Sequence, residues 1–186
     1  MENLYKNIIL EGPDGSGKSY IGKKLEALTG RTTYHAGGVP RSIKMLLSRA
    51  DDIYLKAQKP DFIFDRHPAI SEQVYGPIMR NSSRISMGTS HQMLKALNPL
   101  ILYLRPTDEQ LRESREFAVN DKNKPDHKPK AHRKLLDKHY PKIIEEYDWL
   151  MHNLAYSHQV VQIDPRNKPL VDSILRNIAR TLPCVG

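Results

Sequence analysis

Residues 11–19 constrain the fold of this chain more than any other stretch. They read EGPDGSGKS and fit the spacing G-x-x-x-x-G-K-[ST] of a phosphate-binding P-loop. The apolar run at 8–10 precedes this loop, and apolar residues at helical spacing follow it. A P-loop needs a buried strand before it and a helix after it, because the N–H groups at the helix N-terminus bind the anion. The sequence therefore predicts a nucleoside-triphosphate site.

The residue types within the loop have separate tasks. Glycine permits positive φ angles and close approach of the backbone to a phosphate. Lys18 is expected to reach the β- and γ-phosphates of ATP, and the Ser19 hydroxyl is expected to ligate Mg²⁺. The predicted nucleotide-binding residues are Gly12, Asp14, Gly15, Ser16, Gly17, Lys18 and Ser19.

Length, charge and cysteine content limit the class of protein. The chain has 186 residues, which predicts one domain over 1–186, and a formal net charge of +8, which suits phosphate-bearing ligands. Its one cysteine, Cys184, builds neither an internal disulfide nor a cysteine-based metal site, so a cytoplasmic location is expected. No apolar run approaches the ~18 residues of a membrane span, and no secretory signal is recognisable at the N-terminus.

Hydrophobic patterning predicts alternating strands and helices. An α/β P-loop NTPase fold is expected, with a five-stranded parallel sheet, helices on both faces and a mobile, lysine-rich lid over about 118–134. Strands are predicted at 5–11, 31–34, 62–64, 100–104 and 160–163. Helices are predicted at 18–29, from 41 onward, and at 70–79, 87–97, 107–117, 135–150 and 170–182.

A second motif, Asp65-Arg66, directly follows a predicted strand. It should lie at the carboxyl end of the sheet, where ligands bind in open α/β folds. There the Asp65 carboxylate can organise Mg²⁺ or its waters, and the Arg66 guanidinium can hold a phosphate through two bonds. The two motifs together favour phosphoryl transfer.

With these residues in place, the chain resembles the thymidylate kinase family. The resemblance rests on the P-loop, on Gly37-Gly38, on Asp65-Arg66-His67 followed by Ser71 and Tyr75-Gly76, and on the strand that begins Asn98-Pro99. It spans nearly the whole chain. It implies Mg²⁺-dependent transfer of the ATP γ-phosphoryl to dTMP or a related deoxynucleoside monophosphate, small-molecule partners rather than nucleic acid or membrane, and a homodimer to which Tyr147 and Trp149 could contribute.

The resemblance also implies roles for individual residues. Asp14 would hold the deoxyribose 3′-hydroxyl, and Arg66 would hold the acceptor phosphate with help from Arg41. Gly15 stands where some family members carry a catalytic arginine, so lid arginines would do that work here. The candidates for it are Arg112 and Arg115, with Arg133 behind them.

Three departures from the family pattern concern the acceptor base. His67 and Pro68 stand where an aromatic residue is usual, and the spacing from Asp65 to Tyr75 is one residue longer. The helix that should read the base offers Leu47, Ser48, Arg49 and Asp51 instead of an aromatic residue and a matched arginine. Tyr75 beside the ribose and Gln73 at a base edge are the remaining substrate candidates. The sequence therefore does not predict which nucleobase the acceptor carries.

Four alternatives remain beside the monophosphate kinase. A deoxynucleoside kinase needs a base for the 5′-hydroxyl just after the second strand, where Tyr34-His35-Ala36 provides no acid. A polynucleotide 5′-kinase fits the charge but lacks a basic groove interleaved with aromatic residues. A regulatory GTPase needs Asn-Lys-x-Asp, of which residues 167–170 hold only the first half. A nucleotide-binding module without activity is the fourth.

Overall fold

The computed structural model describes residues 7–37, 40–59, 61–113 and 137–182. Within these residues the strands form one five-stranded sheet of order β2-β3-β1-β4-β5, and every neighbouring pair is parallel. This confirms the predicted fold class. The strands are β1 (Asn7–Glu11), β2 (Thr32–His35), β3 (Phe62–Asp65), β4 (Pro99–Leu104) and β5 (Gln159–Ile163).

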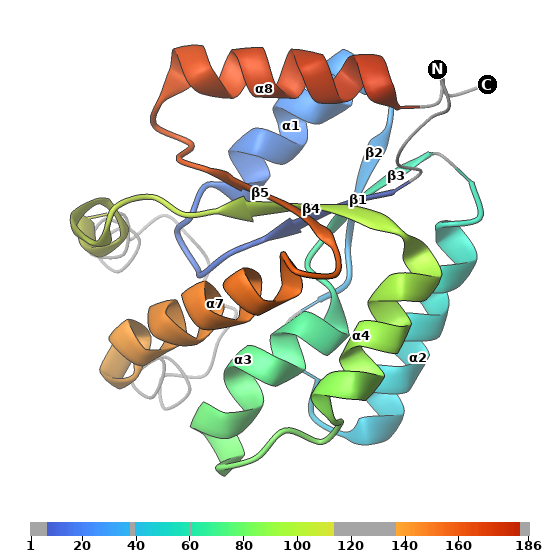
Figure 1. The fold of residues 1–186 in the computed structure, drawn as a ribbon, viewed down its shortest axis with the longest axis vertical. Helices are drawn as coiled ribbons and strands as arrows, with labels where there is room; N and C mark the ends of the chain where they lie inside the picture. The colour runs from blue at the N-terminus through green and yellow to red at the C-terminus, as the bar shows by residue number, and fades with distance from the viewer. Residues whose placement is uncertain (1–6, 38–39, 60, 114–136, 183–186) are drawn as a thin grey trace, which may run out of the picture.

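Helices cover both faces of the sheet, as Figure 1 shows. Helices α1 and α8 lie on one face, while α3, α4 and α7 lie on the other and α2 flanks them. Their bounds are α1 (Lys18–Thr29), α2 (Ile43–Lys56), α3 (Pro68–Arg80), α4 (Met87–Leu97), α7 (Tyr140–Leu154) and α8 (Lys168–Thr181). A further helix begins at residue 108 and is described to residue 113.

Alternation along the strands divides the core in two. In β1, Ile8 and Leu10 pack toward α1 and α8, whereas Ile9 packs toward α3, α4 and α7. All six residues of β4 are buried. A strand that is apolar throughout suits a parallel sheet with both faces covered, as predicted from its sequence.

Polar side chains cap the N-termini of α2 and α3, as they also do for α4 and α8. Helix α2 was expected from Arg41, but Ser42 is its N-cap and accepts a hydrogen bond from the Met45 N–H at 3.1 Å. Helix α3 begins two residues before its predicted start. The His67 ring accepts from the Ala69 N–H at 3.2 Å, and Pro68 occupies the first turn, where its missing N–H costs nothing.

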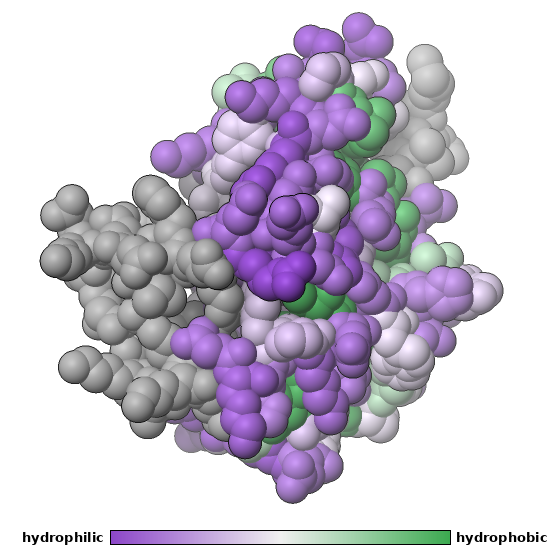
Figure 2. Space-filling view, turned by 90° about the vertical axis from the view of Figure 1, so that its left-hand side faces the viewer, coloured by the Kyte–Doolittle hydropathy of each residue, from purple (hydrophilic) through white to green (hydrophobic). Residues whose placement is uncertain are grey.

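Parallel pairing brings three acidic or basic side chains to one edge. Asp65 is in register with both His35 of β2 and Leu10 of β1, so the strand-end residues His35, Asp65 and Glu11 lie side by side. Figure 2 views the molecule from the side on which the strands end, and hydrophilic residues cover most of the described surface there. The P-loop leaves β1 at this edge.

Several predictions fall on residues that the structure leaves undescribed. The lid at 118–134, Arg115 and Arg133 lie outside the described residues. Within the ranges given above, none of the helices combines the length and the apolar character needed to cross a membrane.

Candidate functional site: a phosphate cradle facing a strand-end arginine

The P-loop backbone adopts conformations that favour glycine. Gly12, Gly15 and Gly17 have φ angles of 143°, 85° and 86°, all in the region that other residues rarely adopt. A Cβ atom on Gly12 would lie 2.5 Å from the Leu104 carbonyl oxygen, too close for any side chain. Gly17 is the N-cap of α1, so the loop delivers the chain directly into the helix whose N–H groups face the cradle.

Lys18 is folded back onto its own loop. Its Nζ donates to the carbonyl oxygens of Gly12 and Pro13, both at 2.8 Å, and lies 3.4 Å from the Ser16 hydroxyl. Burial and the neighbouring Arg66 lower the pKa of Lys18 to about 7. A bound triphosphate would add its negative charge to that of Asp14, Asp65 and Glu11 near Lys18.

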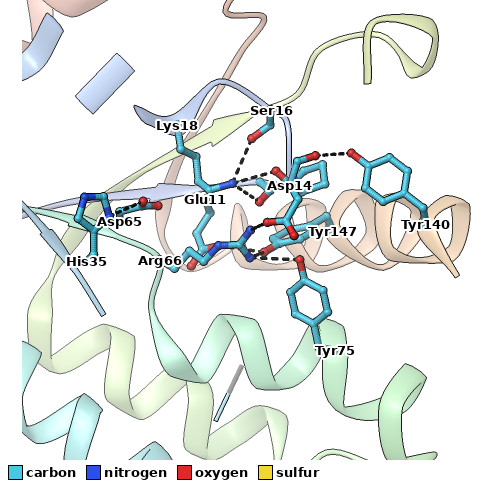
Figure 3. Close-up of polar contacts among 12 residues, drawn as sticks. Glu11, Asp14, Ser16, Lys18, His35, Asp65, Arg66, Tyr75, Tyr140 and Tyr147 are labelled. Atoms are coloured by element: carbon cyan, nitrogen blue, oxygen red, sulfur yellow. Dashed lines mark hydrogen bonds and ion pairs between the residues drawn. The ribbon is translucent and has the colours of Figure 1, made fainter. Parts of the chain in front are cut away.

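Arg66 leaves the end of β3 in a strained conformation. Its φ angle is 74°, unusual for a residue with a side chain, and its N–H donates to the Leu10 carbonyl at 3.0 Å. This backbone turns the guanidinium toward the P-loop, where it bonds the Asp14 carboxylate at 2.7 Å. Its other terminal nitrogen donates to the hydroxyls of Tyr147 at 2.9 Å and Tyr75 at 3.2 Å (Figure 3).

The two cations that the sequence singled out therefore share one site. Lys18 contacts the carbonyl of Pro13, and Arg66 contacts the side chain of the next residue, Asp14. Figure 3 shows both side chains reaching the same loop from different elements. A phosphoryl donor in the cradle and an anion on Arg66 would be neighbours.

Glu11 lies beneath this pair and is fully buried. Its carboxylate accepts from the His67 N–H at 2.6 Å and lies 3.3 Å from the Tyr147 hydroxyl. Burial raises the pKa of Glu11 to about 7, although Arg66 and the His67 N–H counteract part of that rise. Glu11 thus lies near both Arg66 and Lys18 of the P-loop. The sequence motif alone did not reveal this position.

One carboxylate oxygen of Asp65 has a hydrogen-bond partner, and the other has none among the described residues. Oδ2 lies 2.8 Å from His35 Nδ1, whereas Oδ1 is buried without a hydrogen-bond partner. Ser19 is exposed in the first turn of α1. A buried carboxylate oxygen in need of a partner and a hydroxyl are both hard oxygen ligands of the kind Mg²⁺ prefers. These residues fit a magnesium site.

Two other predicted site residues, Arg112 and Arg41, lie farther from the contacts of Lys18 and Arg66. Arg112 lines a hollow of about 320 Å³ with Tyr140 of α7, the helix that contacts the P-loop. Arg41 is exposed, and among the described residues no side-chain contact joins it to Arg66. Its carbonyl accepts from Arg84 at 2.7 Å, which anchors the start of α2.

The two candidates for reading ribose and base are turned inward. Both amide hydrogens of Gln73 are used within the protein, on the Ile85 carbonyl at 3.0 Å and the Ser90 hydroxyl at 2.8 Å. Tyr75 is only 3% exposed, and its hydroxyl supports Arg66. These placements argue against direct substrate contact by either side chain, and neither is carried into the proposed function.

Two tyrosines of α7 belong to the site and were not predicted to. The Tyr140 hydroxyl donates to the Asp14 carbonyl, and the Tyr147 hydroxyl lies between Glu11 and Arg66. The sequence placed both on the apolar face of a long helix, which suggests packing. The overlooked signal is that a buried tyrosine hydroxyl needs a polar partner.

Comparison by sequence finds no matching family model and no match among curated proteins. Solved structures do match. YorR from Bacillus subtilis, in complex with phosphorylated GDP, has a TM-score of 0.65 at 20% identity over 92% of each chain. Deoxyadenosine kinase from M. mycoides, with the products dCMP and dCDP, has a TM-score of 0.63 at 13% identity, covering 94% of this chain and 99% of that one.

A sugar kinase from Janibacter sp. is similar over 96% of this chain and 99% of its own, with a TM-score of 0.53 at 13% identity. At such identities the likeness concerns the fold alone. The chain therefore has the α/β P-loop fold that these kinases also have.

Replacing Gly12 tests the cradle. We expect Gly12→Ala to lower the free energy of unfolding by about 3 kcal/mol, because its φ angle is nearly exclusive to glycine and a Cβ would meet a backbone oxygen. Gly30→Ala is the control: it also has a positive φ but open space around it, and should lose about 1 kcal/mol. Urea unfolding measures both. Equal losses would contradict the close approach.

His67 predicts a pH dependence. Burial lowers the pKa of His67 to about 3, so the folded state binds fewer protons than the unfolded state between that value and the ordinary 6.5. The contribution of His67 to stability should thus fall as pH drops below 6.5. His67→Asn keeps a capping side chain but does not titrate. Between pH 7 and pH 5 the wild type should lose about 1–2 kcal/mol more than this variant in urea unfolding. Identical pH profiles would refute the assignment.

Proposed function

We propose that this protein is a kinase that transfers the γ-phosphoryl of ATP to dTMP or a related deoxynucleoside monophosphate. The observation that carries the proposal is the meeting of two anion-binding groups at one loop. Lys18 and the glycine cradle suit a triphosphate, and Arg66, 2.7 Å from the Asp14 side chain, suits a second phosphate beside it.

Positioning and charge neutralisation would do most of the catalytic work. An oxygen of the acceptor monophosphate attacks the γ-phosphorus, the bond to the β–γ bridging oxygen breaks, and ADP leaves with that electron pair. A monophosphate oxygen is already ionised, so no side chain has to remove a proton. Lys18 and Arg112 would neutralise charge on the donor, with Arg115 from outside the described residues.

The carboxylates of the site explain why a metal ion would be needed. Glu11, Asp14 and Asp65 surround Lys18 and Arg66, so a polyphosphate would meet three acidic and two basic groups. Ser19 and Asp65, directly or through water, would hold Mg²⁺. When bound, the ion would supply positive charge that offsets the negative charge of the phosphates.

Acceptor binding would exchange the partner of Arg66. The guanidinium that now bonds Asp14 would take the acceptor phosphate, which frees the Asp14 carboxylate for the 3′-hydroxyl. A structural neighbour of this fold, the deoxyadenosine kinase, has deoxynucleotides bound as products, which fits the second candidate considered below.

The substitutions Lys18→Ala and Arg66→Ala test the proposal. Each should lower kcat by at least about 100-fold, because each removes a charge aimed at a reacting phosphate. A coupled assay with ATP, Mg²⁺ and each common deoxynucleoside monophosphate provides the measurement, and chelation of Mg²⁺ should stop turnover. Arg180→Ala, an exposed arginine on α8, is the control. Full activity of Arg66→Ala on every monophosphate would exclude this function.

One observation favours a second candidate, a deoxynucleoside kinase. The sequence offered no acid just after the second strand, yet the sheet places Asp65 of β3 against His35 at the end of β2. With Nδ1 held by Asp65, the other ring nitrogen of His35 could take the proton that a hydroxyl acceptor must lose.

The substitution His35→Gln separates the two candidates. A nucleoside kinase should phosphorylate free deoxynucleosides, and this variant should lower its kcat by about 100-fold or more. A monophosphate kinase should ignore free nucleosides, and the variant should change its kcat less than about threefold, since no proton is removed. The same coupled assay, run with both acceptor classes, decides between them.

A further inference from the structure

Helix α7 reaches both halves of the site through two tyrosines. Tyr140 and Tyr147 are seven residues apart and so lie on one face of the helix. The Tyr140 hydroxyl donates to the backbone carbonyl of Asp14 in the P-loop. Tyr147, two turns further on, reaches Arg66 and Glu11 (Figure 3).

The Tyr147 hydroxyl has one hydrogen-bond donor and one hydrogen-bond acceptor as partners. It accepts from Arg66 Nη1 at 2.9 Å and lies 3.3 Å from a carboxylate oxygen of Glu11, to which it can donate. The side chain is fully buried. Burial raises the pKa of Tyr147 well above its ordinary value, so the hydroxyl keeps its proton for Glu11.

Aromatic neighbours fix the Tyr147 ring. Tyr103 of β4 stacks on it with 18° between the ring planes, and Tyr75 of α3 meets it edge-on at 85°, both with centroids 6.1 Å apart. Such packing leaves the ring one orientation. Its hydroxyl is therefore a rigid support for a long and otherwise flexible arginine.

We infer that Tyr147 is a positioning residue for phosphoryl transfer: it holds the Arg66 guanidinium where the acceptor phosphate binds. Tyr147 does not touch the reacting atoms in this role. It acts through Arg66, whose Nη2 stays directed toward Asp14 because the Tyr147 hydroxyl holds Nη1. The inference rests on the proposed function, since it assigns Arg66 to the acceptor.

Tyr147→Phe tests the inference by removing one oxygen atom from a packed ring. The KM for the acceptor should rise by about 10- to 100-fold, as expected for a hydrogen bond to a charged group, while the KM for ATP changes less than about twofold. Tyr156→Phe is the control, because Tyr156 is 79% exposed just beyond the same helix. Unchanged acceptor KM, or equal changes in both KM values, would overturn the inference.

A double-mutant cycle tests whether Tyr147 acts through Arg66. Arg66→Lys cannot hold Tyr147 and a phosphate together, because lysine lacks the guanidinium fork. If the inference is right, adding Tyr147→Phe to Arg66→Lys should raise the acceptor KM no further. Additive effects of the two substitutions would show that Tyr147 acts elsewhere.

Amide hydrogen exchange provides a readout that needs no turnover. The His67 N–H donates to Glu11, whose other oxygen faces Tyr147. Tyr147→Phe should speed exchange of this amide about tenfold or more, and Tyr156→Phe should leave it unchanged. An unaltered His67 amide overturns the inference even if the wild type proves inactive. Wild-type inactivity on every acceptor would instead refute the proposed function, so the two failures are distinguishable.

Discussion

The bond between Arg66 and Asp14 is the interaction on which the candidate site depends. An arginine with a side chain only 13% exposed must have its charge and its donors satisfied, and here a carboxylate and two tyrosine hydroxyls do so. Those partners come from the P-loop, α3 and α7. The same contact therefore joins the end of β3 to the loop after β1 and holds the Arg66 guanidinium at that loop. Glu11 completes the arrangement, because its buried carboxylate lies near both Arg66 and Lys18.

The fold could be predicted because its signals are local. The P-loop spacing requires a strand and a helix around it, and continuous apolar runs such as β4 mark strands covered on both faces. The position of Asp65 and Arg66 also followed, since the carboxyl ends of parallel strands share one edge. The predicted start of α2 at Arg41 was too early, because the side chain of Ser42 caps the helix.

The interior of the site could not be predicted, because its contacts join residues far apart in the chain. Tyr140 bonds a residue 126 positions earlier, and Tyr147 lies against one 136 positions earlier. Periodicity placed both tyrosines on a buried face but said nothing of their hydroxyl partners. His35 shows the same limit. No acidic residue is adjacent to His35 in the sequence, whereas Asp65 of the neighbouring strand β3 lies beside it in the structure.

Lys18 has a consequence for the energetics of ligand binding. Its ammonium already has two close carbonyl partners within the loop, so a nucleotide must replace these bonds rather than satisfy an idle cation. The net gain is then a difference between two sets of bonds, smaller than the strength of either. The carbonyl oxygens of Gly12 and Pro13 thus compete with any anion for the Lys18 ammonium, and an anion of high charge would displace them more readily than one of low charge.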